Sequence, residues 1–162
     1  MSFKSYLGQS ALPRGLENNN PGNLVLTSIN WQGKIPNAQN TDGHFEQFTQ
    51  LRWGLRAMIR DIMNDISEGT NTLRSLINEY APPHENDTEN YINFVSNLTG
   101  ILPSERLLLN KTVITALVKA KVAMENGSAY SGYVTDKDIN DAYAILGKPL
   151  ADGPLNVEQK KK

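Results

Sequence analysis

The sequence predicts a mainly helical protein (mainly α, with an α+β character) that carries a small, irregular β or loop lobe at its N-terminus. Three observations lead to this fold class. The chain up to about residue 50 is polar, rich in Asn and Gly, and lacks helical periodicity. After that point, apolar residues recur at helical spacing in segments separated by Gly or Pro. With 162 residues and 39% hydrophobic content, the chain can bury one core.

The N-terminal lobe contains two candidate strands, residues 24–27 and residues 44–48. In the second segment, aromatic residues alternate with polar ones, so Glu46 is expected to face away from the neighbouring rings. We expect Phe45 and Phe48 to lie in the core, as we do Trp53 at the start of the first long apolar stripe. The lobe therefore combines short strands with loops.

Apolar stripes predict five or six helices in the rest of the chain. The clearest cover residues 51–68, 72–80, 88–98, 111–124 and 135–146. Residues 111–124 are apolar around more than half the circumference, so we expect this helix to be central and buried. Cap residues support the boundaries, with Thr72, Asp87 or Thr88, and Thr135 at helix starts and Gly69, Gly100 and Gly147 at helix ends.

These elements predict one folded domain over residues 14–147. A leader over residues 1–13 and a flexible tail over residues 148–162 are expected to flank it. The leader has no apolar run of signal-peptide length, and no segment is long enough to span a membrane. We therefore expect synthesis in the cytosol and, if the protein leaves the cell, another route of release.

The composition also excludes several classes of function. A formal net charge of −1 provides no overall attraction for nucleic acid, and the basic block at residues 160–162 is typical of a disordered end. The absence of cysteine excludes disulfides and thiolate chemistry. His44 and His84 lack the spacing of a zinc site, so we expect neither a metal nor a cofactor.

A run of amides, residues 14–24, is the strongest candidate for a binding site. Each Asn side chain has one acceptor and two donors, which match the hydroxyl and acetamido groups of an amino sugar. The candidate sugar-binding residues are Asn19, Asn20 and Asn23. Trp31 either stacks on a sugar face or anchors the loop to the helices. The alternative for the whole run is a solvated Asn/Gly turn.

Glu125 is the main candidate for chemistry because helical spacing places it at the end of the inward stripe of the apolar helix. A carboxyl partly removed from water keeps its proton more readily, as a general acid requires. The alternative is a solvated Glu125 that pairs with Lys121 one turn earlier. Glu17 and Glu46 are the second and third carboxylate candidates.

Taken together, these segments resemble a family of bacteriophage virion proteins, with related prophage products, that is assigned to the lysozyme-like superfamily. The resemblance covers about residues 14–146 and is specific through the order and number of its motifs. They are Arg14-Gly15-Leu16 with Asn19-Asn20-Pro21-Gly22-Asn23, Trp31-Gln32-Gly33, Asp42-Gly43-x-Phe45-x-x-Phe48, Trp53-Gly54-Leu55-Arg56-Ala57, residues 80–92 and Glu125-Asn126-Gly127. It implies a lysozyme-like fold with a cleft between the lobe and the helices.

The middle of the chain is more distantly similar to autolysin-type N-acetylglucosaminidases, which cut peptidoglycan. In that group the catalytic Glu ends a helix upstream of the Asn turn, whereas only a short leader precedes the turn here. The resemblance suggests a circularly permuted arrangement in which residues 111–125 replace that helix and Glu125 is the acid. Related phage proteins carry a basic residue at the position of Glu17, which weakens Glu17 as an acid.

The resemblance implies cleavage of peptidoglycan glycan strands by general-acid catalysis, carried out by a virion-associated protein. No second carboxylate is paired with Glu125 by sequence, which favours a substrate-assisted or lytic-transglycosylase route; hydrolysis through Glu17 or Glu46 stays open. The expected partners are glycan strands and other virion proteins. We expect the protein in the virion, or in the host cytoplasm before release, and its action on periplasmic peptidoglycan. The alternative is a non-catalytic virion protein with the same fold that binds glycan or serves assembly.

Overall fold

The computed structural model describes residues 3–81 and 87–156. Six α-helices and two 3₁₀ helices form within these residues, where β-structure is limited to isolated bridges, and the prediction of a mainly helical fold is confirmed. The elements are α1 (Arg14–Glu17), η1 (Asn37–Gln39), α2 (Leu51–Ser67), α3 (Leu73–Tyr80), α4 (Thr88–Thr99), α5 (Lys111–Asn126), η2 (Ser128–Tyr133) and α6 (Asp136–Ala144). Pro82 and Pro83, His84 and the basic C-terminal block fall outside the described residues.

Chain contacts divide the protein into two compact units. The first, which we call the loop unit, comprises the chain up to Arg60 together with Lys121–Gly147. The second, the helical unit, comprises Asp61–Ala120 and the chain from Lys148 onward. The helices α2 and α5 each contribute residues to both units. None of the helices in the described ranges is long and apolar enough to cross a membrane.

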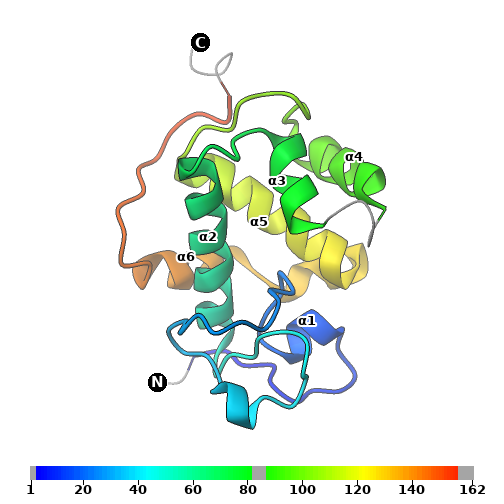
Figure 1. Ribbon diagram of the computed structural model, residues 1–162, viewed down its shortest axis with the longest axis vertical. Helices are drawn as coiled ribbons and strands as arrows, with labels where there is room; N and C mark the ends of the chain where they lie inside the picture. The colour runs from blue at the N-terminus through cyan, green and yellow to red at the C-terminus, as the bar shows by residue number, and fades with distance from the viewer. Residues whose placement is uncertain (1–2, 82–86, 157–162) are drawn as a thin grey trace. The chain divides into compact units, whose positions relative to one another are not determined.

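The loop unit contains α1 among the loops coloured blue to cyan in Figure 1. Sequence predicted a loop here, but Pro13 precedes a single helical turn that the bond from Asn18 N to Arg14 O closes at 3.1 Å. One turn is too short to show periodicity. The two predicted strands do pair, through an antiparallel bridge between Val25 and Phe45, yet neither extends into a ladder.

The side chain of Asn20 explains why the pairing stops. Its Nδ2 donates to both Leu24 O and Glu46 O at 3.0 Å, while Leu24 N donates to its Oδ1 at 3.0 Å. The amide therefore takes backbone groups that a longer ladder would use. Of the rings predicted to lie in the core, Phe48 is fully buried, and Phe45 and Trp53 are half-buried.

The helical unit has an apolar interior, with Leu73, Leu76 and Ile77 of α3 fully buried. The helices α3 and α4 lie side by side (Figure 1). Thr72 caps α3 in a capping box with Ser75, as predicted, and Gly100 ends α4 in the left-handed conformation. The N-cap of α4 is Asp87, because Thr88 instead donates its hydroxyl to Ala81 O at 2.6 Å.

The predicted burial of residues 111–124 is confirmed, since the apolar residues Val113, Ile114, Leu117, Val118 and Val122 of α5 are at most 1% exposed. Fully buried Lys121 on the same helix was not predicted. Residues from the proposed tail bind the start of α5, where Lys111 N donates to Ala151 O at 2.9 Å. Residues from the proposed leader are also bonded, since Tyr6 N donates to Asn19 Oδ1 at 2.8 Å.

Candidate functional site

The amide run lies in the interior of the loop unit. Asn19 and Asn20 have no exposed surface. Asn19 donates to Ser5 Oγ and Phe48 O, both at 2.9 Å, and accepts from Tyr6 N. Together with the three bonds of Asn20, these contacts satisfy both amides. Neither side chain can contact a ligand in this conformation, so we do not retain the sugar-binding role predicted for them.

The backbone of the run also explains the choice of asparagine. Asn19 and Asn23 have φ angles of 54° and 51°, in the left-handed region that Asn tolerates better than most residues. These two residues flank Pro21 and Gly22, which are buried. The run is therefore a tight bend, and its side chains hold the backbone around it.

Asn126, the last residue of α5, connects this bend to the helix. Its Oδ1 accepts from Leu16 N at 3.2 Å, and its Nδ2 donates to Pro21 O at 2.8 Å and to Val122 O at 3.0 Å. Gly15 packs against it so closely that a Cβ there would lie 2.6 Å from Asn126 Oδ1. The contact fixes the end of α5 against the amide run, and only a residue without a side chain fits at position 15.

Glu125 lies beside Asn23 as a result. Asn23 Nδ2 donates to Glu125 Oε1 at 2.9 Å, and both side chains are half-buried. This hydrogen bond joins residues 102 positions apart in the chain. Oε1 of this carboxyl is therefore held as a hydrogen-bond acceptor by Asn23. Lys121, the partner in the alternative interpretation, is fully buried, whereas Glu125 is half-buried.

Glu46, the third carboxylate candidate, is sealed in the interior. It is fully buried, and its Oε1 lies 2.9 Å from Nζ of Lys34, whose side chain is only 7% exposed. Thr27 N and Thr27 Oγ1 donate to the other oxygen at 3.2 and 3.3 Å. A buried ion pair of this kind holds two loops together, and it offers no surface on which a substrate could react.

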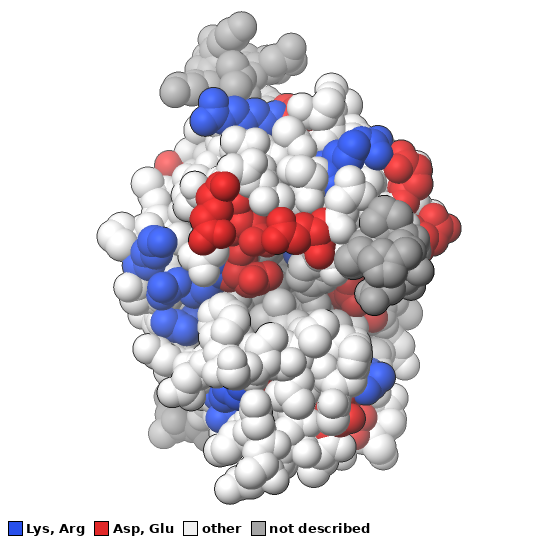
Figure 2. Space-filling model, in the orientation of Figure 1, with Lys and Arg blue, Asp and Glu red and all other residues white. Residues whose placement is uncertain are grey.

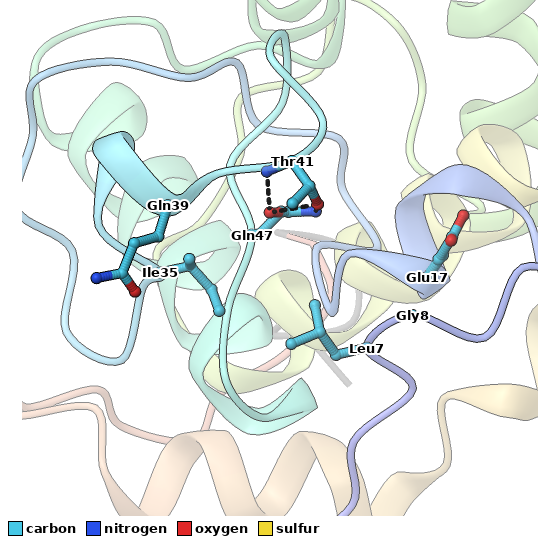
Figure 3. A pocket seen from close by; sticks show the side chains of 7 residues that line it. All are labelled: Leu7, Gly8, Glu17, Ile35, Gln39, Thr41 and Gln47. Carbon is cyan, nitrogen blue, oxygen red and sulfur yellow. Dashed lines mark hydrogen bonds between the residues drawn. The ribbon is translucent and has the colours of Figure 1, made fainter.

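Glu17, the second candidate, lines a pocket of about 290 Å³ in the loop unit (Figure 3). The other lining residues are Leu7, Gly8, Ile35, Gln39, Thr41 and Gln47. Gln47 is occupied, since its Oε1 accepts from Thr41 N at 2.8 Å and its Nε2 donates to Asn18 Oδ1 at 3.0 Å. Glu17 is half-buried on α1, while the polar residues Gln39 and Thr41 are exposed.

Trp31 is half-buried in the loop that leads to Gly33, so part of its indole faces solvent. Gly33 itself is required by Trp53: with a φ of 77°, a Cβ at this position would lie 2.1 Å from Trp53 Cγ. The glycine of the Trp-Gln-Gly motif is therefore explained by its packing against Trp53. Stacking of a ligand on Trp31 stays a prediction.

The loop around Asp42 is fixed by charge. Asp42 accepts from Arg14 Nε at 2.6 Å, from Asn18 Nδ2 at 2.9 Å and from the backbone N–H groups of His44 and Phe45. The bond from Arg14 is the largest cause of a pKa for Asp42 well below its usual range. On the face shown in Figure 2, acidic side chains form one large patch, and several basic side chains form another.

Sequence reasoning missed Asn126 and Gly15 as site residues. The adjacency of Asn126 to Glu125 was a usable signal, because a residue that ends a helix can bond the loop packed against that end. Gly15 gave no local signal, since the atom nearest to a Cβ at this position belongs to Asn126, far along the sequence.

In the loop unit, a half-buried carboxyl at the end of α5 is thus held against a bend of internal amides. The chain is 38% identical over 130 residues to protein P5 of Pseudoalteromonas phage PM2, a match that covers 78% of each chain. It belongs to the family of this bacteriophage protein. No model of a protein family matches the chain.

Proposed function

We propose that this chain is a lysozyme-like, virion-associated protein of a phage that cleaves the glycan strands of peptidoglycan, with Glu125 as general acid. The bond between Asn23 Nδ2 and Glu125 Oε1, 2.9 Å long, carries this proposal. It brings the acid at the end of α5 next to the amide bend, as a permuted arrangement of the glycosidase elements requires. The relationship to a bacteriophage protein supports the part of the proposal that assigns this chain to a phage.

The chemistry begins with a protonated Glu125 whose Oε1 is held by Asn23. The proton of this carboxyl passes to the glycosidic oxygen as the bond from that oxygen to the sugar C1 breaks, and positive charge develops on the ring. Asn23 acts as a positioning residue because it fixes the plane of the carboxyl. Trp31, with its partly exposed indole, supports the apolar face of a sugar ring.

The second half of the reaction needs a nucleophile at C1. Glu46 is excluded from this role in the described conformation, because it is fully buried against Lys34. We favour a route in which the sugar supplies the nucleophile, either the acetamido oxygen or the 6-hydroxyl group. Hydrolysis with Glu17 as the second carboxylate is the other route, and the pocket that Glu17 lines is where it would bind substrate. Neither route requires a metal or a cofactor.

The proposed substrate places the protein at the cell wall. It would be made in the host cytoplasm, be carried in the virion with other virion proteins, and act on periplasmic peptidoglycan. Nucleic acid is not a proposed partner, in keeping with the net charge of −1.

The test compares the wild-type protein with Glu125→Gln on purified peptidoglycan sacculi. We expect Glu125→Gln to lower the rate of glycan release by about 10²- to 10⁴-fold, the usual contribution of a general acid. Glu105→Gln is the matched control, since this glutamate is also half-buried but belongs to the helical unit and has no role in the proposed chemistry, and Glu17→Gln tests the hydrolysis route. A loss with Glu17→Gln and none with Glu125→Gln would reject Glu125 as the acid. Mass analysis of the fragments would separate anhydro sugars from reducing ends, and so transglycosylation from hydrolysis.

A non-catalytic role in glycan binding or particle assembly is the second candidate. It is favoured by the use of Asn19 and Asn20 inside the fold, because the amides that suggested sugar recognition already serve as structural bonds. Binding of sacculi without release of fragments, equal in wild type and Glu125→Gln, would establish this role instead.

A further inference from the structure

Two arginines of the loop unit, Arg56 and Arg60, converge on the C-terminal end of α6. They lie one helical turn apart on α2. Arg56 Nε donates to Ile145 O at 2.9 Å, and Arg60 Nη1 donates to Leu146 O at 2.8 Å. Arg56 is only 6% exposed. Both guanidinium groups thus bind carbonyl oxygens of the two residues that follow α6 (Asp136–Ala144).

The positive charge at this place is not balanced by a carboxylate. Within residues 3–81 and 87–156, neither arginine forms an ion pair, and Arg60 Nε is buried without a hydrogen-bond partner. Burial, followed by the charge of Arg60, lowers the pKa of Arg56. The two backbone carbonyl groups are neutral dipoles, so they satisfy hydrogen bonds but do not neutralise the two guanidinium charges.

Gly147 leaves an opening above these groups. A Cβ at this position would have two neighbours within 4 Å, Arg56 Nη2 at 3.7 Å and Arg60 Nη1 at 3.8 Å. One atom from each arginine therefore faces the same open point beside an exposed glycine. Gly147 also has a φ of 72°, which favours a residue without a side chain.

We propose that Arg56, Arg60 and Gly147 form a binding site for a phosphate-type oxyanion. Two guanidinium groups match the charge of a phosphate dianion and can donate to more than one of its oxygens. Bonds of this kind are about 2.8 Å long, so an oxygen near the open point needs only a small approach toward both nitrogens. The ligand is either free phosphate or a phosphate group on a larger molecule. The site does not depend on Glu125 or on cleavage of glycan.

The experiment titrates inorganic phosphate into the full-length, ¹⁵N-labelled protein at constant ionic strength and follows the amide signal of Gly147 and the side-chain Nε–H signals of the arginines. We expect saturable shifts at these positions in the wild type. Arg60→Gln should weaken binding at least tenfold. Arg52→Gln, on the same helix with its Nε bonded to Gln50, is the matched control and should bind like the wild type.

Gly147→Ala provides a second variant, since its methyl group fills the open point and should abolish the shifts while the arginines keep their charges. Shifts that do not saturate, or equal affinities in Arg60→Gln, Gly147→Ala and Arg52→Gln, would overturn the proposal. A parallel titration with sn-glycerol 3-phosphate identifies the source: binding as tight as that of inorganic phosphate supports a group carried on a larger molecule, and binding of inorganic phosphate alone supports the free ion.

Discussion

The interior of the loop unit and the interior of the helical unit are stabilised by different kinds of contact. Around the amide bend of the loop unit, the interior contains asparagine side chains and a buried ion pair. In the helical unit, α3 and α4 bury aliphatic and aromatic side chains against each other. Apolar packing tolerates substitutions that conserve volume, whereas each buried hydrogen bond requires particular atoms at particular positions. Substitutions should therefore be more costly around the amide bend.

The largest effect is expected from Gly54→Ala, which tests how rigid the amide bend is. A Cβ on Gly54 of α2 would lie 1.7 Å from Asn19 O, a backbone atom that cannot rotate away. We expect the free energy of unfolding of the loop unit to fall by about 3 kcal/mol or more. Trp31 and Trp53, the two tryptophans of the chain, both belong to this unit, so urea unfolding followed by tryptophan fluorescence measures it.

Gly132→Ala is the matched control for that measurement. A Cβ on Gly132 has no neighbour within 4 Å, so this variant should unfold within about 0.5 kcal/mol of the wild type. Similar stability of the Gly54 and Gly132 variants would mean that the bend moves freely.

A smaller effect should follow from Asn20→Ala, which removes a buried amide of the loop unit. We compare it with Ile77→Val, which shortens a buried apolar side chain of the helical unit. The substitution leaves Leu24 N and Glu46 O without the partners that the amide supplies. We expect a loss of about 3 kcal/mol in the loop unit, since each unsatisfied buried group costs about 1–3 kcal/mol. Ile77→Val in α3 should cost only about 1 kcal/mol by thermal unfolding monitored by circular dichroism. Equal losses of unfolding free energy in the two variants would mean that the buried amide contributes no more to stability than the apolar contact does.

These contacts also show what the sequence could and could not predict. The long helices were predictable because a stripe that repeats over several turns is a strong signal, and Thr72, Thr135 and Gly100 marked their ends. The single turn of α1 was not, since four residues contain no period. Nor was the absence of a ladder between the candidate strands, because it depends on the side chain of Asn20, four positions before Leu24, folding back to bond Glu46 O.

The candidate site was predictable in part. The apolar stripe placed Glu125 at the end of its helix, and the structure brings it beside Asn23. The same amide pattern misled about Asn19 and Asn20, because an Asn suited to a sugar hydroxyl is equally suited to a backbone group. Composition cannot decide between the two. That choice depends on which side chains the fold covers, and therefore on contacts between distant residues.

Asp42→Asn should have an intermediate effect that depends on pH. Because the pKa of Asp42 is well below its usual range, with Arg14 as the main cause, the folded loop unit binds fewer protons than the unfolded chain near pH 4. The stabilisation is therefore present above the unfolded pKa of about 4 and is lost as the pH falls below it. We expect Asp42→Asn to cost about 2 kcal/mol at pH 7, and the difference from wild type to shrink below pH 4.

Asp141→Asn is the control for this pH dependence. Asp141 pairs with Lys137 on the surface of α6, where Lys137 is 78% exposed, so the pair should contribute less than about 1 kcal/mol at any pH. Unfolding curves from pH 3 to pH 7 would reveal the contrast. A constant difference between wild type and Asp42→Asn over this range would contradict the linkage to Arg14.

The smallest effects are expected when the same substitution, Thr to Ala at a helix N-cap, is made once in each unit. Thr72 in the helical unit and Thr135 in the loop unit each cap a helix, α3 or α6, in a capping box with the residue three positions on. Thr72→Ala and Thr135→Ala should each cost about 1 kcal/mol, because each removes one bond to a helix N–H group. Amide exchange should rise at the start of α3 in the first variant and at the start of α6 in the second. Only Thr135→Ala should shift the urea midpoint seen by Trp31 and Trp53; equal shifts would mean that the units unfold together, and that their different interiors do not give them separate stabilities.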